Sequence, residues 1–171
     1  MTLDRALGDP LAARSAVIVP DVIDAGTAAA VRERMRYLRY TLVDRGSYDH
    51  ADATGEREVL ATLRELAAAT TERALELVTA RAIRLGPGDY LLAHHDPIVE
   101  RGVTVVLDVS PAPLATGELH VRQGGRVLFR MPVVPGSAAI VPRAPSVACG
   151  HSYVTKRSRG EIVRLVATFS G

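Results

Sequence analysis

The stretch YLLAHHD at residues 90–96 ends an apolar run in two histidines and one aspartate. Because side chains on a β-strand point alternately to its two faces, His94 and Asp96 are expected on one face and His95 on the other. Imidazole and carboxylate groups are common ligands of divalent metals. The stretch therefore predicts either part of a metal site or a strand end at which the aspartate accepts hydrogen bonds from backbone amides in a turn.

A third metal ligand has to come from another part of the chain. His50 lies in a polar stretch and is expected to be solvated, and His120 lies in a candidate strand, where an ordinary sheet residue explains it equally well. His151 follows an apolar run and a proline-rich turn at residues 142–145. Two histidines and one carboxylate leave coordination positions open, which is the arrangement found in non-haem Fe(II) oxygenases.

The second half of the chain consists of short runs of β-branched residues separated by glycine and proline. The candidate strands are residues 82–85, 90–93, 103–109, 118–121, 126–131, 138–141 and 162–169. Turn signals separate them, namely GPGD at 86–89, PAP at 111–113, QGG at 123–125, VPGS at 134–137 and SRG at 158–160. Because these strands follow helices and do not alternate with them, they predict an antiparallel sandwich or barrel with helices packed outside.

The first half of the chain has mainly helical periodicity, with apolar residues at steps of three and four. We predict an edge strand at residues 15–20, a helix at 24–42 capped by Asp24 or Thr27, a polar loop at 43–55 and a second helix at 57–78, interrupted near 70–71. The chain is therefore expected to form a single domain over residues 1–171. In this division, residues 1–79 are mainly helical support and residues 80–171 form the β core.

Length and composition argue against several classes of protein. The 171 residues, 47% of them hydrophobic, suit one soluble domain with a substantial core. No window approaches the ~20 apolar residues of a membrane span, and the first residues, MTLDRALGDPLAAR, do not form a signal peptide, so we expect a cytoplasmic protein. The single cysteine, Cys149, rules out an internal disulfide framework and a multi-cysteine zinc site. A basic excess of two charges and the absence of tryptophan give little support for nucleic-acid binding.

From about residue 84 to residue 169, the chain resembles the iron(II)/2-oxoglutarate-dependent dioxygenase superfamily, in particular its prolyl-4-hydroxylase-like bacterial members. The matching blocks, in the order the family shows, are LGPGDYLLAHHD at 85–96, VTVVLDV at 103–109, TGEL at 116–119, VPGSAAIVP at 134–142, GH at 150–151 and RLVATF at 164–169. The resemblance implies an α+β, mainly β chain that forms a double-stranded β-helix, or jelly roll, with the N-terminal helices packed on one sheet.

The resemblance also implies an enzyme in which His94, Asp96 and His151 bind Fe(II) and form the catalytic centre. Such an enzyme converts 2-oxoglutarate and O2 to succinate and CO2 while it hydroxylates an unactivated C–H bond. The arginines near the predicted site are able to bind carboxylates, so we expect a small amino-acid-like metabolite as the substrate. Desaturation and cyclisation are further outcomes, whereas Asp96 argues against halogenation, because halogenating relatives carry a small residue in its place. The alternatives are a hydroxylase of a peptide- or carrier-bound residue, a cupin-like metalloprotein (isomerase, lyase or sensor) that does not use 2-oxoglutarate, and a metal-free binding module.

In the family, a basic residue on the final strand binds the far carboxylate of 2-oxoglutarate. Arg164 fits this role because it lies within an apolar run, where a lone charge needs a buried anion as its partner. The family spacing from the distal histidine is usually shorter, and the hydroxyl residue that often follows the arginine by two is Val166 here. Arg159, Arg157 and Lys156 therefore remain alternatives.

Two other residues lie close to the predicted ligands in the sequence. Tyr90, four residues before His94, is expected on the ligand face and is a candidate to hydrogen-bond 2-oxoglutarate, although an ordinary packed tyrosine is an equal explanation. Cys149, two residues before His151, either points toward the site or is a small core residue. The loops predicted at residues 43–55 and 97–102 are candidates to fold over the active-site mouth.

Overall fold

The computed structural model describes residues 16–43, 46–94, 102–143 and 147–171, with the backbone alone at residues 46, 47, 93 and 94. The elements in chain order are β1 (Val17–Val19), α2 (Ala25–Met35), β2 (Thr41–Val43), β3 (Gly46–Asp52), α3 (Arg57–Thr71), β4 (Glu76–Leu85), β5 (Tyr90–His94), β6 (Val103–Asp108), β7 (Leu114–Gln123), β8 (Arg126–Val133), β9 (Ala138–Pro142), β10 (Val147–His151) and β11 (Ile162–Ser170).

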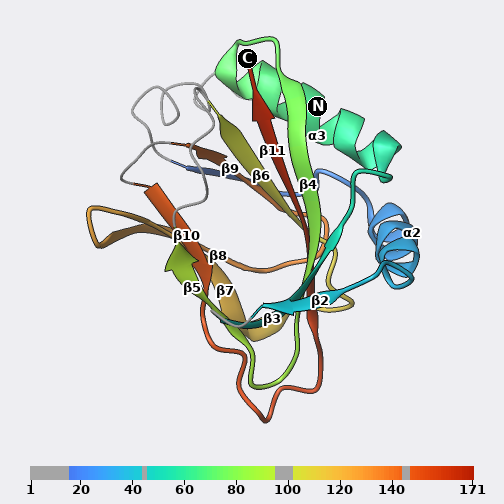
Figure 1. Cartoon of the computed structure of the whole chain (residues 1–171), viewed down its shortest axis with the longest axis vertical. Coiled ribbons are helices and arrows are strands. Elements are labelled where there is room, and N and C mark those ends of the chain that lie inside the picture. The colour runs from blue at the N-terminus through green and yellow to red at the C-terminus, as the bar shows by residue number, and fades with distance from the viewer. Residues whose placement is uncertain (1–15, 44–45, 95–101, 144–146) are drawn as a thin grey trace.

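The strands form two antiparallel sheets that β3 joins along one side (Figure 1). The first sheet has the order β1-β9-β6-β11-β4-β3, and the second has the order β3-β5-β10-β7-β8. β3 takes part in both because Asp49–Asp52 pair with β4, whereas Gly46 and Ser47 pair with β5. The predicted jelly roll is confirmed, and β1 is an edge strand as expected.

Both helices pack on the outer face of the first sheet, on the side away from the second sheet (Figure 1). The Asp24 side chain caps α2 by accepting a hydrogen bond from the Thr27 amide at 2.9 Å. Val31 and Met35 of α2 and Leu63 of α3 are fully buried in the core between the helices and this sheet. The described part of the chain contains no helix with the length and apolarity to span a membrane.

Both helices are shorter than the sequence predicts. α2 ends at Met35, and Leu42 lies in β2 with 63% of its surface exposed, so the apolar periodicity continued past the true helix end. α3 ends at Thr71, close to the predicted interruption, because Glu72 adopts a left-handed conformation with φ of 54°. Val78 is consequently part of β4, and the predicted boundary at residue 80 falls inside that strand.

The prediction of a loop at residues 43–55 is wrong, because this stretch contains β3. Its polar composition does not prevent a strand, since β4 and β5 pair with its backbone, and its side chains are divided between solvent, a cavity between the sheets and the core beneath the helices. His50 and Tyr48 line that cavity, whereas Asp49 forms an ion pair with Arg84 at 3.1 Å. β10 was also absent from the predicted strands, although it carries His151.

Candidate active site

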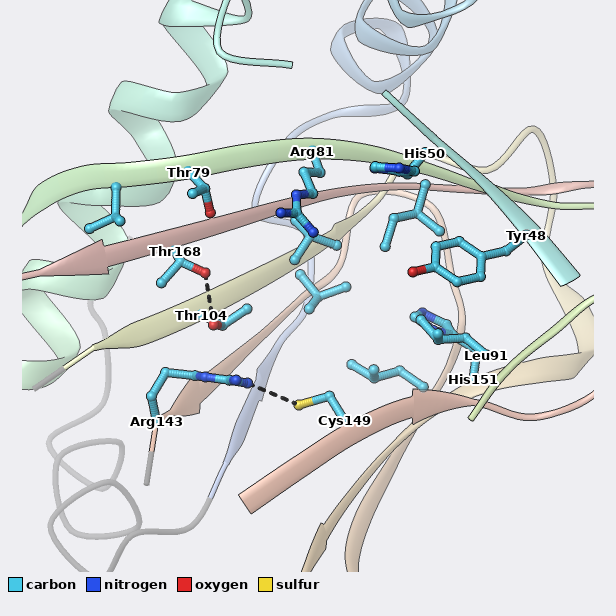
Figure 2. A pocket seen from close by; sticks show the side chains of 15 residues that line it. Tyr48, His50, Thr79, Arg81, Leu91, Thr104, Arg143, Cys149, His151 and Thr168 are labelled. Carbon is cyan, nitrogen blue, oxygen red and sulfur yellow. Dashed lines mark hydrogen bonds between the residues drawn. The ribbon is translucent and has the colours of Figure 1, made fainter. Parts of the chain in front are cut away.

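A pocket of about 270 Å³ lies between the two sheets (Figure 2). Strands β4, β6 and β11 form one wall, β5, β7 and β10 form the other, and β3 closes the side that joins them. Apolar side chains such as Val106, Leu119 and Val166 make up much of the surface. The polar groups come from residues far apart in the sequence, which is typical of ligand pockets in folded domains.

His151 is the one member of the predicted metal-ligand set whose side chain the structure describes. It is the last residue of β10, it lines the pocket, and only 4% of its surface is exposed. The backbone of His94 pairs with Cys149, two residues before His151, so β5 and β10 bring these parts of the chain side by side. Asp96 and the side chain of His94 lie outside the described residues, and the three-ligand site remains a prediction.

Within the described ranges, no three histidine, cysteine, aspartate or glutamate side chains are grouped to hold a metal ion. The described His151 imidazole does suit one position of such a site, because it is buried and faces the pocket. His50, expected in solvent, also lines the pocket from β3. His120 is half-buried on β7, and its neighbour Leu119 lines the pocket, so strand alternation places His120 on the opposite face, as the plain sheet residue.

Arg164 lies on β11 on the same face as Val166 and Thr168, which line the pocket, and it is fully buried. Its Nε donates to Asp108 Oδ2 at 3.0 Å, and Asp108, also fully buried, accepts the Ser110 amide at Oδ1 at 2.9 Å. Burial lowers the pKa of the Arg164 guanidinium, and the Asp108 carboxylate opposes that shift. Nη1 and Nη2 of Arg164 are buried without a hydrogen-bond partner among the described residues.

This arrangement suits the binding of a ligand carboxylate by Arg164. A guanidinium offers donors on more than one edge, and Asp108 occupies only the Nε position. Ile83 of β4 is paired with Arg164 of β11 in the sheet, and Ile83 lines the pocket. Because paired residues point to the same face of a sheet, the Arg164 side chain lies on the face toward the pocket. Arg164 itself is not among the residues that line the pocket, but it is buried on the pocket-facing side of β11. The alternatives Arg159, Arg157 and Lys156 are all exposed and do not line the pocket either.

Sequence reasoning missed Asp108, although a signal was present. The residue is the single acid in the apolar run VTVVLDV, and β6 pairs it directly with Arg164 in the sheet register. A lone acid and a lone base in two apolar strands suggest a buried pair only once those strands are known to be neighbours. The same pairing explains how both charges are accommodated in the interior.

Tyr90, the residue predicted to hydrogen-bond 2-oxoglutarate, is the first residue of β5. Its surface is 37% exposed, and it is not among the residues that line the pocket. The register between β5 and β10 shifts, so that Leu91 pairs with His151 and His94 pairs with Cys149. The four residues 91–94 of β5 thus span three residues of β10, so the alternation of side chains cannot be extended from His94 to Tyr90 across this irregularity, and the role of Tyr90 stays a prediction. Tyr48 instead points its hydroxyl into the pocket (Figure 2).

The chain is similar to known proteins in its structure but not in its sequence. Neither a protein-family model nor a curated protein sequence matches the chain. A prolyl-4-hydroxylase from Pseudomonas putida aligns with a TM-score of 0.74 and 16% identity, over 96% of this chain and 97% of its own.

Two further solved structures extend this likeness. A 2OG-Fe(II) oxygenase-family oxidoreductase from Burkholderia pseudomallei aligns with a TM-score of 0.79 and 14% identity, over 96% of this chain and 89% of its own. HygX from Streptomyces hygroscopicus, solved with nickel, 2-oxoglutarate and hygromycin B bound, aligns with a TM-score of 0.75 and 12% identity, over 98% and 87% of the two chains. The chain therefore has the fold of the Fe(II)/2-oxoglutarate oxygenases.

Proposed function

We propose that the chain is an Fe(II)- and 2-oxoglutarate-dependent oxygenase that oxidises a C–H bond of a small, amino-acid-like metabolite. The observation that carries the proposal is the buried Arg164 guanidinium, whose terminal nitrogens are unpaired among the described residues, in a chain with the fold of 2-oxoglutarate oxygenases. A pocket of about 270 Å³ lies just below the ~300–1,000 Å³ typical of small-molecule sites, which favours a small substrate over a peptide or carrier protein.

In this proposal, His94, Asp96 and His151 hold the metal, and Arg164 binds the far carboxylate of 2-oxoglutarate. When bound, the metal and 2-oxoglutarate supply the oxidising chemistry, with O2 as co-reactant and with succinate and CO2 as products. The chain's own residues bind and orient the two substrates. The apolar side chains of Val106, Leu119 and the other pocket walls limit the access of water to the reacting groups. Asp96 favours hydroxylation, desaturation or cyclisation over halogenation.

Conversion of 2-oxoglutarate to succinate tests this function without knowledge of the second substrate. Purified protein supplied with Fe(II), 2-oxoglutarate and O2 is expected to form succinate slowly, and faster in the presence of a suitable small metabolite. The His151→Ala variant should lose this activity by at least ~100-fold, because one metal ligand is gone. His120→Gln is the matched control, since this histidine lies on the outer face of β7, and it should retain activity. Equal activity of the two variants would contradict the assignment of His151.

One observation favours a second candidate, a cupin-like isomerase, lyase or sensor that does not use 2-oxoglutarate. Asp108 already balances the charge of Arg164, so a ligand carboxylate at Arg164 adds a second negative charge nearby. Calorimetric titration of 2-oxoglutarate into Ni(II)-loaded protein discriminates the two candidates. The oxygenase requires binding that weakens at least ~10-fold when Arg164 is replaced. Because a lone buried Asp108 could unfold the chain, the double variant Arg164→Met, Asp108→Leu, which removes both charges, serves for this test.

A further inference from the structure

The pocket contains a second arginine that the proposed binding of 2-oxoglutarate does not use. Arg81 lies on β4 and extends into the pocket (Figure 2). It pairs in the sheet with Val166, two residues along β11 from Arg164, so the two guanidinium groups start from neighbouring positions on adjacent strands. Unlike Arg164, Arg81 is exposed to solvent, and it therefore lies on the accessible side of the pocket.

Arg81 also differs from three other sheet arginines in having no carboxylate partner among the described residues. Arg84 pairs with Asp49, Arg130 with Glu118 and Arg164 with Asp108. The sheet register places Asp52 opposite Arg81, but the Asp52 carboxylate accepts a hydrogen bond from Thr54 Oγ1 at 2.8 Å. In the part of the chain that the structure describes, Arg81 has no hydrogen bond or ion pair, and no aspartate or glutamate lines the pocket.

Threonine hydroxyls, which carry no charge, lie around the space that Arg81 enters. Thr79, Thr104 and Thr168 line the pocket from three neighbouring strands, and the hydroxyls of Thr104 and Thr168 are 3.1 Å apart (Figure 2). Arg143 lies across the pocket, where its Nη1 is 3.9 Å from the Cys149 sulfur. The described lining of this region therefore combines threonine hydroxyls with the positive charge of Arg81, which favours an anionic ligand.

We infer that Arg81 binds a carboxylate of the substrate to be oxidised, at a position separate from the 2-oxoglutarate carboxylate at Arg164. The Arg81 guanidinium carries a single positive charge, which one carboxylate balances, whereas the charge of a doubly charged phosphate exceeds it. The inference rests on the proposed function for the role of the second ligand. It narrows the substrate class to small metabolites with a carboxylate group, such as free amino acids, and excludes the same molecules in amide form.

Matched pairs of acids and amides test the inference by binding alone. Calorimetric titrations of Ni(II)-loaded protein use L-proline and L-prolinamide, L-leucine and L-leucinamide, and L-glutamine and L-glutamine amide, each with and without 2-oxoglutarate. At least one acid should bind at least ~10-fold more tightly than its amide. Arg81→Gln should remove that difference by weakening the acid ~10- to 100-fold, while leaving the affinity for the amide and for 2-oxoglutarate unchanged. Arg126→Gln, at an exposed position of β8 away from the pocket, is the control and should change neither.

Three results would overturn the inference. They are equal binding of acid and amide in every pair, an acid preference that survives Arg81→Gln, and a loss of 2-oxoglutarate binding in Arg81→Gln, which would make Arg81 the cosubstrate anchor. Failure of 2-oxoglutarate to bind the unmodified protein is a different result. It would contradict the proposed function. The role of Arg81 would still be decided by comparing the affinities for acids and amides between Arg81→Gln and Arg126→Gln.

Discussion

At the residue scale, burying the charges of Arg164 and Asp108 costs stability, but in our proposal the site requires the buried guanidinium. Transferring either charge alone into the interior costs several kcal/mol, and the pair is tolerated because each group compensates the other. The Ser110 amide donates a hydrogen bond to the second Asp108 oxygen, so both oxygens of the carboxylate are engaged. In our account, Asp108 positions the guanidinium by its Nε and leaves the terminal nitrogens to a ligand.

Replacing Asp108 should therefore destabilise the protein strongly. Asp108→Asn leaves the buried Arg164 charge without compensation, and the free energy of unfolding is expected to fall by about 3–5 kcal/mol. Urea denaturation followed by circular dichroism measures this loss. Glu118→Gln is the control, because its ion pair with Arg130 is partly exposed and should contribute less than about 1 kcal/mol. Similar losses of stability in the two variants would show that burial of the ion pair between Asp108 and Arg164 does not determine its contribution to stability.

His120 should make stability depend on pH. Burial is the main cause that lowers its pKa, Arg122 and Arg130 lower it further, and Glu118 opposes them. Since the unfolded chain has the higher pKa, of about 6.5, the unfolded state binds the proton more readily. The contribution of His120 to stability is complete above that pH and is lost as the pH falls from about 6.5 through the lower pKa of the folded state.

The free energy of unfolding should accordingly decrease between pH 7.5 and pH 5, and it should decrease less in His120→Gln. Urea titrations at several pH values on metal-free protein measure both slopes. If the variant and the unmodified protein lose stability in parallel over this range, another group is responsible.

At the element scale, β7 requires glycine at position 117, because the backbone there is left-handed and there is no room for a side chain. Gly117 has φ of +78°, and a Cβ there would lie 2.0 Å from Ile162 Cδ1 and 3.0 Å from Val154 Cγ2. The residue lies within the register irregularity of β7 between Leu114 and Leu119. It thus allows β7 to pass close to β11 where the two sheets approach each other.

Gly117→Ala should combine backbone strain with overpacking of the core. Gly125→Ala is the matched control, because Gly125 has a similar φ of +81° but open space around the missing Cβ. We expect Gly117→Ala to be destabilised by roughly 1–3 kcal/mol more than Gly125→Ala in thermal or urea unfolding. Equal losses would mean that backbone conformation alone accounts for the requirement at position 117.

The elements differ in how far the sequence could predict them. Apolar strands such as β6 and β11 were predicted because their composition and turn signals agree. β3 was not predicted, because its sequence GSYDHAD is mostly polar and lacks the apolar alternation by which a strand is recognised. The length of α2 was overestimated because Leu38 continues the periodicity and still packs against the core after the helix has ended.

At the scale of the whole molecule, the pocket exists only because the two sheets face each other. Four strands that are distant in the sequence contribute side chains to one cavity, for example Arg81, Val106, Leu119 and His151. The role predicted for His151 rested on a resemblance in the order of short motifs, whereas the buried charge predicted for Arg164 rested on its place in an apolar run. Arg81 and Asp108 could not be assigned in the same way, because their roles depend on which strands are neighbours and in which register they pair.

The central claim is that this pocket binds Fe(II) and 2-oxoglutarate together. The most direct measurement is the visible absorption spectrum of anaerobic protein with one equivalent of Fe(II), recorded before and after addition of 2-oxoglutarate. The account predicts a weak charge-transfer band that develops with 2-oxoglutarate and is absent in His151→Ala. Iron-loaded protein that shows no band at saturating 2-oxoglutarate, or a band that persists in His151→Ala, would contradict it.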